Sequence, residues 1–156
     1  MMDVKAKQQI RGKVHYVLRG PDGKVKATHD TVMNTITALH DCLVADRLAG
    51  GSDTLITHGK LGTGSGQEAS DTDLDTPCSG ARTAIDSLTQ GTGGDDNDAI
   101  VVVTFGAGVD TGTITEAGLF THLSNAVMQC YDDSLNVTKG ADDTLEITWT
   151  ITYGAS

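Results

Sequence analysis

The fold is decided by residues 145–153, which read Leu145-Glu146-Ile147-Thr148-Trp149-Thr150-Ile151-Thr152-Tyr153. Apolar and polar residues alternate along this stretch without a break, and the side chains of a β-strand point alternately to its two faces. The stretch therefore predicts a strand with one face in a core and the other face toward water or a partner. Trp149 stands at its centre, and we expect the core to form around it.

The rest of the chain favours further strands. Its 156 residues fit one domain; only 4% are aromatic, whereas Gly contributes 19 residues and Thr is abundant. Thr suits the pleated surface of a strand, and Gly suits turns and bulges. We expect a mainly β protein, an antiparallel, jelly-roll-like β-sandwich over residues 13–156 that follows an N-terminal arm of residues 1–12. Its other strands are predicted at about residues 14–19, 24–32, 55–61, 81–88, 100–105, 113–120 and 127–131.

One segment is typical of a helix. Apolar residues recur at near-helical spacing between Ile36 and Leu48, and Gly50-Gly51 follows as a stop signal. Asn34 or Thr35 is placed to accept the first free backbone N–H groups as the N-cap. We therefore expect one α-helix, at about residues 35–49, that packs on a sheet.

The net charge of −10 is unevenly distributed. Residues 1–60 carry nine Lys or Arg and six Asp or Glu, whereas residues 61–156 carry two and fifteen. A nucleic-acid-binding domain normally presents a basic face, so we expect no direct contact with nucleic acid. Two interpretations of the basic N-terminal stretch stay open, a solvated tail or contacts with an acidic partner such as another copy of the chain. The residues for such contacts are Lys5, Lys7, Arg11 and Lys13.

An acidic segment suggests a metal site. Asp71, Asp73 and Asp75 have the alternate spacing of a calcium-binding loop. An EF-hand is excluded, because Thr76 stands where that loop needs glycine and Arg82 stands where it needs a carboxylate. A solvated loop and a calcium site of another kind both stay open. Further ligands for the latter would be Asp95, Asp96 and Asp98.

Catalytic motifs are weak in this sequence. Asp110-Thr111-Gly112 matches the signature of aspartic proteases, in which carboxylates of two copies share one proton, but no apolar flank precedes the aspartate. The run from Gly62 to Gly66 lacks the Lys-Ser or Lys-Thr pair and the apolar helix that follow a phosphate-binding loop. The five His and three Cys residues form no metal-ligand spacing. We expect no enzyme, no catalytic residue and no cofactor.

Three elements, in order along residues 14–153, resemble parts of bacteriophage virion proteins. The first two resemble the N-terminal domain of tail-collar fibre proteins; they are Ile56-Thr57-His58-Gly59-Lys60-Leu61-Gly62-Thr63-Gly64 and Thr115-Glu116-Ala117-Gly118-Leu119-Phe120. The third, the Leu-x-Ile-x-Trp-x-Ile strand of residues 145–151, is similar to strands of free-standing phage head and tail proteins of this length. The sequence contains neither a repetitive shaft nor a receptor-binding tip, which favours a compact decoration or adaptor protein over a fibre.

The resemblance implies a structural component of a bacteriophage virion, made in the host bacterial cytoplasm and located in the particle. Our first expectation is a capsid decoration (cement) protein that binds and stabilises the head shell. The alternative is a tail, collar or baseplate adaptor, or a fibre-attachment protein. The partners implied are the major capsid protein or tail components, together with further copies of the chain, for which a trimer is favoured. No contact with a membrane is implied.

Two residues of these elements are expected to be structural, in addition to Trp149. Glu116 could accept backbone N–H groups and fix a connection between strands, or it could be exposed. Gly118 is expected where the backbone passes close to a neighbour. A carbohydrate- or calcium-binding β-sandwich is a more distant alternative; binding sugars would need an exposed aromatic platform, whereas Trp149 and Tyr153 fall on the expected core face.

Overall fold

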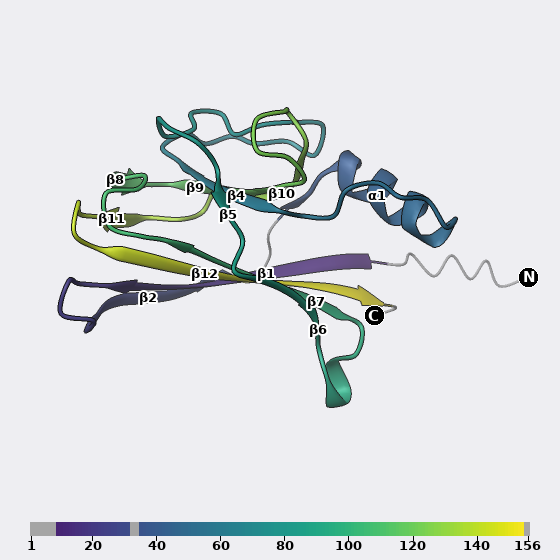
Figure 1. Ribbon diagram of the computed structural model, residues 1–156, viewed down its shortest axis with the longest axis horizontal. Coiled ribbons are helices and arrows are strands. Elements are labelled where there is room, and N and C mark those ends of the chain that lie inside the picture. Colours follow the sequence, from purple (N-terminus) through teal and green to yellow (C-terminus); the bar gives the residue numbers. More distant parts are fainter. Residues whose placement is uncertain (1–8, 32–34, 155–156) are drawn as a thin grey trace, which may run out of the picture.

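The structure, a computed structural model, describes residues 9–31 and 35–154 (Figure 1). Two five-stranded antiparallel sheets face each other, which confirms the predicted β-sandwich. Sheet A has the order β2 (Val25–Thr31), β1 (Gln9–Arg19), β12 (Thr144–Gly154), β7 (Asp98–Phe105) and β6 (Ser87–Gln90). Sheet B has the order β3 (Thr35–Ile36), β10 (Met128–Asp132), β9 (Glu116–Phe120), β4 (His58–Gly62) and β5 (Thr83–Ala84).

Three smaller elements complete the described chain. A two-stranded ladder joins β8 (Gly112–Ile114) to β11 (Val137–Lys139). A short 3-10 helix, Gly93–Asp95, lies between β6 and β7. Helix α1 (Ala38–Leu48) lies at one end of the sandwich, opposite the end that carries the β1–β2 turn (Figure 1).

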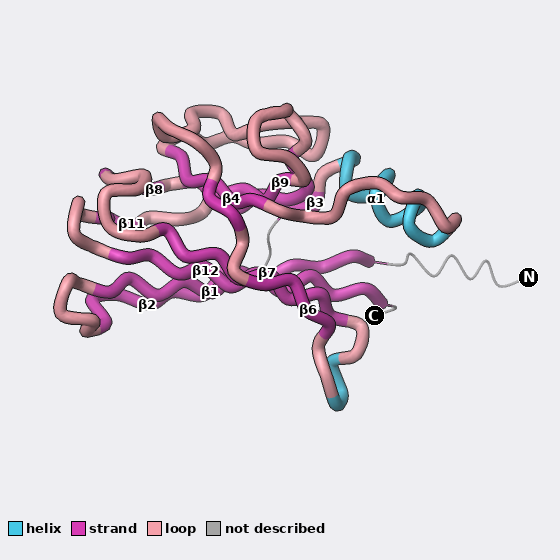
Figure 2. Tube along the Cα trace, viewed as in Figure 1, coloured by secondary structure: helices cyan, strands magenta, loops and turns pink. Residues whose placement is uncertain are grey.

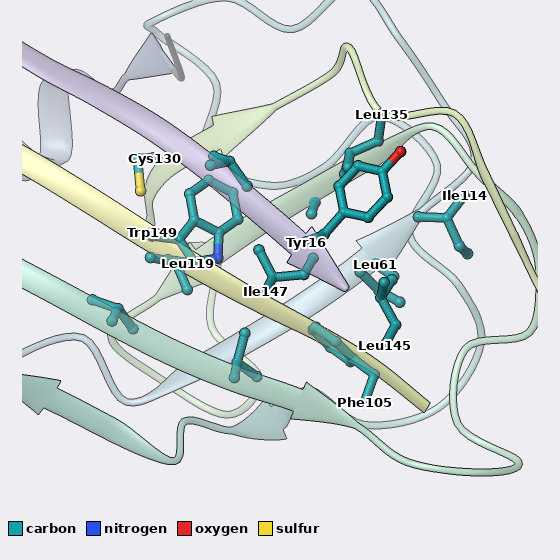
Figure 3. Close-up of a cluster of buried hydrophobic side chains, with 14 of the residues drawn as sticks. Tyr16, Leu61, Phe105, Ile114, Leu119, Cys130, Leu135, Leu145, Ile147 and Trp149 are labelled. Atoms are coloured by element: carbon teal, nitrogen blue, oxygen red, sulfur yellow. The ribbon is translucent and has the colours of Figure 1, made fainter. Parts of the chain in front are cut away.

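The core forms around β12, as its alternating sequence predicts. Trp149 is fully buried and lies between Val14 of β1 and Val101 of β7, its register partners on the two sides. Figure 3 shows its indole ring among side chains of both sheets, with Leu119 and Cys130 contributed by sheet B. Burying a side chain of this size contributes on the order of 2–3 kcal/mol, so β12 anchors the whole sandwich.

The two sheets are covered differently. Strands β9 and β10 are buried at every residue, because sheet B packs on sheet A with one face and is covered by loops on the other (Figure 2). Leu74, from the loop between β4 and β5, packs there against Phe120, Met128 and Tyr131. In β12, by contrast, buried and half-buried residues alternate. Sheet A therefore has one face in the core and one uncovered face.

Several predicted boundaries are wrong. Strand β1 begins at Gln9, so residues 9–12 belong to the sandwich and not to an arm, because they pair with the end of β12. Residues 1–8 lie outside the described residues. Helix α1 begins at Ala38, because Thr35 and Ile36 pair with β10 as strand β3. Thr37 is the N-cap, but its hydroxyl donates to carbonyl oxygens of β10, at 2.6 Å to Met128 and 3.0 Å to Gln129.

Candidate functional site

Glu116 is the first residue of β9 and is fully buried. Its Oε1 atom accepts hydrogen bonds from the backbone N–H groups of Gly64, at 3.1 Å, and Thr76, at 2.8 Å. Its Oε2 atom accepts one from the backbone N–H of Asp75, at 3.2 Å, and one from the side-chain amide of Gln67. The carboxylate thus binds both ends of the loop of residues 63–76. Of the two interpretations that the sequence leaves open for Glu116, an acceptor of backbone N–H groups or an exposed side chain, the structure shows the first, at the start of a strand and with the N–H groups of a loop as donors.

Two glycines make room for this carboxylate. A Cβ atom on Gly62 would lie 2.4 Å from Oε1 of Glu116, and one on Gly64 would lie 2.8 Å from the same atom. Neither distance is compatible with a side chain, so both positions require glycine. The glycines that resembled a phosphate-binding loop therefore surround a carboxylate of the protein itself.

The segments of residues 56–64 and 115–120, two separate elements in the sequence, lie side by side. Strand β4 pairs with β9 in antiparallel register, with Gly62 opposite Glu116. Beyond the strands, the Thr115 hydroxyl donates to the Gly64 carbonyl oxygen at 2.7 Å, and the Thr115 N–H donates to the Gly62 carbonyl oxygen at 3.0 Å. These elements are separated by about fifty residues of sequence yet form one structural unit, which we call the glutamate lock (Gly62, Gly64, Thr115 and Glu116).

Gly118 lies where the outer layer of sheet B is tightly packed. A Cβ atom at this position would lie 3.1 Å from side-chain atoms of Leu74, Met128 and Phe120. The Arg82 guanidinium lies 3.6 Å from the centroid of the Phe120 ring. A side chain at residue 118 would therefore require Leu74, Met128 or Phe120 to shift.

Lys60 and Asp110 form a buried ion pair. Nζ of Lys60 lies 2.6 Å from Oδ1 of Asp110, with 3% and 1% of the two side chains exposed. The same ammonium donates to the carbonyl oxygens of Ser79 and Ala81, both at 3.3 Å. This pairing contradicts the aspartic-protease hypothesis, because the Asp110 carboxylate is closed off from solvent and neutralised by Lys60. Asp110 also has a φ of 47°, which Asp tolerates better than most residues.

The aspartates considered for calcium are not brought together. Asp73 lies 3.3 Å from Arg82, Asp71 accepts the backbone N–H of Glu68, and Asp75 accepts the hydroxyl of Thr76. Within residues 9–31 and 35–154, no group of three or more His, Cys, Asp or Glu residues is placed to hold a metal ion. The predicted site of Asp71, Asp73 and Asp75, with Asp95, Asp96 and Asp98, is therefore not formed in this structure.

The aromatic residues offer no platform for a sugar. Trp149, Tyr16 and Tyr131 are buried, as are both phenylalanines, and the remaining aromatic, Tyr153, is half-buried. Stacking on a sugar ring needs an exposed aromatic face. The carbohydrate-binding alternative therefore has no support in the side chains of this fold.

The uncovered face of sheet A is the first candidate interaction surface. Arg11 and Lys13 lie exposed on this face of β1, whereas Lys5 and Lys7 of the predicted basic stretch lie outside the described residues. Across β12 and β7, half-buried polar and aliphatic side chains continue the face. They are Glu146, Thr148, Thr150, Thr152, Ile100, Val102 and Thr104. The same face also carries Glu146, with Asp30 beside His15 and Asp98 beside Thr152, so it presents charges of both signs to a partner.

An apolar cavity beside α1 is the second candidate surface. It has a volume of about 480 Å³ and lies between α1 and the ends of β6, β7 and β12. Three of its lining side chains are large, apolar and exposed: Leu48 by 84%, Leu55 by 43% and Leu88 by 36%. Exposed apolar side chains gathered around a cavity are typical of a docking site.

Two polar side chains line the same cavity and join helix to sheet. Nε2 of His40, on α1, lies 2.5 Å from the hydroxyl of Tyr153, on β12. Burial raises the pKa of Tyr153 to about 12, so its hydroxyl stays protonated at neutral pH. Nδ1 of His40 is buried and makes no well-formed hydrogen bond within the described residues, although the Gln129 side chain lies close enough to raise the pKa of the ring. The helical spacing of the apolar residues predicts that Leu48 is buried, but Leu48 lies exposed at the edge of the cavity, so the sequence pattern does not indicate the cavity.

The comparisons with known proteins leave the function to be inferred from the residues. The chain matches no protein-family model, and no significant match was found among the curated proteins or the solved structures. Within the part of the chain that the structure describes, no helix is long and apolar enough to cross a membrane.

Proposed function

We propose that this chain is a structural component of a bacteriophage virion, a capsid decoration protein that binds and stabilises the head shell. In this role it acts through surface contacts with the major capsid protein and further copies of itself, and it catalyses no reaction. It is made in the host bacterial cytoplasm and is incorporated into the particle.

The uncovered face of sheet A carries this proposal. It is the broad side of a rigid five-stranded sheet, and exposed Arg11 and Lys13 lie on it in a chain of net charge −10. Threonines and one glutamate, Glu146, line β12 on this side, and the short threonine side chains lose little entropy when a partner covers them. Such a face, with charges of both signs, supports binding to another protein surface.

The glutamate lock is a second support. It joins the two sequence elements on which the resemblance to virion proteins rests, so they form one structural unit rather than scattered short matches. It also fixes the loop of residues 63–76 over sheet B with hydrogen bonds to a buried carboxylate. A rigid loop loses little entropy on binding, which favours a permanent place in an assembly.

Mass spectrometry of purified particles tests the proposal. We expect the chain in every particle preparation at a fixed ratio to the major capsid protein. Particles made without it should release their DNA at a lower temperature and should lack a density on the head shell in electron micrographs. Absence of the chain from purified particles would show that it is not a virion component.

A tail, collar or baseplate adaptor is the second candidate function. The observation that favours it is the pairing of Lys60-Leu61-Gly62 with Glu116-Ala117-Gly118, since these segments resemble a tail-collar fibre domain. Gold labelling of a tagged chain in purified particles separates the two functions. Label on the head supports decoration, whereas label confined to the tail or its collar supports the adaptor.

A further inference from the structure

Helix α1 presents a projection and a hollow on the same face. Leu48, 84% exposed, lies at its C-terminal end, and the apolar cavity opens beside it, with His40 in its lining. Residues four apart lie on one side of a helix, so His40, Val44 and Leu48 form a single row along α1. A surface with a knob next to a hole is complementary to a second copy of itself.

We propose that this face binds a second copy of the chain through an antiparallel pairing of the two α1 helices about a two-fold axis. With the axis at Val44, residues equally far from Val44 lie opposite each other. Leu48 of each copy then lies at the cavity of the other, in whose wall His40 is buried with 2% of its surface exposed, and fills the cavity with an apolar side chain. The cavity of about 480 Å³ is large enough for one leucine together with the neighbouring rim side chains.

The charges on α1 fit the same arrangement. Asp41 and Arg47 are both exposed and lie equally far from Val44, so each Arg47 faces Asp41 of the second copy. Within the described residues, Arg47 hydrogen-bonds only to the carbonyl oxygens of Gly51 and Asp53, and no ion pair of Asp41 is formed. The pairing of the two helices would place each Arg47 opposite an Asp41 of the other copy, and the two-fold symmetry would form this ion pair twice.

This inference goes beyond the proposed function and does not depend on it. A two-fold contact produces a dimer, or an assembly built from dimers, whereas the resemblance to virion proteins favoured a trimer. A helix of eleven residues buries less than the roughly 800 Å² per partner of a standard interface. We therefore expect a reversible dimer with a dissociation constant on the order of 10 µM.

Sedimentation velocity across about 1–500 µM tests the pairing, since this range brackets the expected constant. We expect the wild-type chain to change from monomer to dimer, and Leu48→Asp to weaken dimerisation at least tenfold. Leu123→Asp is the matched control, because Leu123 is also exposed, by 48%, and lines a different pocket, with Lys60 and Arg82 and without any residue of α1. Thermal unfolding of each variant confirms that it remains folded.

A charge exchange tests the geometry. Arg47→Asp places a carboxylate opposite Asp41 and should weaken the dimer, and adding Asp41→Arg should restore it. The pairing would be overturned by any of three results. They are a chain that stays monomeric, a trimer, and a dimer whose dissociation constant changes neither with Leu48→Asp nor with the charge exchange. None of these outcomes affects the virion proposal, which instead depends on finding the chain in purified particles.

Discussion

Glu116 shows at the scale of one residue how a buried carboxylate organises a loop. It has no cation beside it among the described residues, and four N–H groups surround it instead. Hydrogen bonds to a charged group contribute about 1.5–3 kcal/mol each, roughly twice the contribution of neutral ones. The charge is therefore stabilised by dipoles of the backbone that it holds in place.

Replacing Glu116 by Gln tests this role. The amide keeps one acceptor oxygen but turns an NH₂ group toward backbone N–H donors, so we expect the free energy of unfolding to fall by about 2–4 kcal/mol. Urea unfolding measures the change, and faster proteolysis within residues 63–76 should accompany it. Glu146→Gln on the uncovered face is the control and should stay within about 0.5 kcal/mol of wild type. Equal effects of the two changes would contradict the role of Glu116.

Gly118 permits a second test at the residue scale. An alanine methyl group would lie 3.1 Å from three side chains, so Gly118→Ala should lower the free energy of unfolding by about 1–3 kcal/mol. Gly106→Ala is the matched control, because a Cβ atom there meets nothing within 4 Å. That change should be neutral or stabilise by up to about 1 kcal/mol. Thermal and urea unfolding compare the two; an unaffected Gly118→Ala would mean that the outer layer repacks freely.

At the scale of elements, strands with a strict alternation could be predicted from sequence, and elements set by distant contacts could not. Residues 145–153 lie within β12 because one strand in the middle of a sheet must alternate when only one of its faces is buried. Strand β11 went unpredicted because its three residues form a strand only by pairing with β8. The start of the helix was predicted too early for a similar reason. Thr35 and Ile36 have the local sequence signals of a helix N-terminus, but they pair with β10 as a strand.

The attachment of α1 to β12 should make stability depend on pH. Burial lowers the pKa of His40 below its ordinary value of 6.5, outweighing the nearby Asp41 and Gln129, which raise it. Between the folded pKa and 6.5 the unfolded chain binds more protons, so the free energy of unfolding should fall as the pH drops below about 6.5. Above that pH, His40 is neutral in both states and contributes no dependence.

His40→Gln tests this prediction, because glutamine stays neutral and can still reach the Tyr153 hydroxyl. Urea unfolding between about pH 7.5 and pH 5 should show a shallower loss of stability for the variant than for wild type. Some dependence should remain, because burial, together with Arg82 and His122, also lowers the pKa of His58. Parallel pH profiles for the two proteins would show that His40 is not the group responsible.

At the scale of the whole molecule, one buried ion pair connects parts that the sequence does not link. Lys60 belongs to β4 of sheet B, and Asp110 lies in the turn that leaves β7 of sheet A. Neither the element that contains Lys60 nor the short protease-like match at Asp110 indicates this pair, because a lysine in a strand is usually exposed. The candidate site was thus predictable only in part: the elements that contain Glu116 and Gly62 are recognisable in the sequence, whereas their contact, the ion pair and the cavity beside α1 depend on tertiary packing.

The pair can be tested by a double-mutant cycle. Lys60→Met leaves the Asp110 carboxylate buried without a counter-charge, and Asp110→Asn does the same to the Lys60 ammonium. Each single change should lower the free energy of unfolding by about 3–5 kcal/mol. Asparagine accepts the positive φ of residue 110, so backbone strain does not complicate the second change.

The double variant should be less destabilised than the sum of the singles by at least about 2 kcal/mol, because no uncompensated charge remains. Additive losses in urea unfolding would mean that Lys60 and Asp110 stabilise the sandwich independently, Lys60 through the Ser79 and Ala81 carbonyls and Asp110 through the N–H of Leu61.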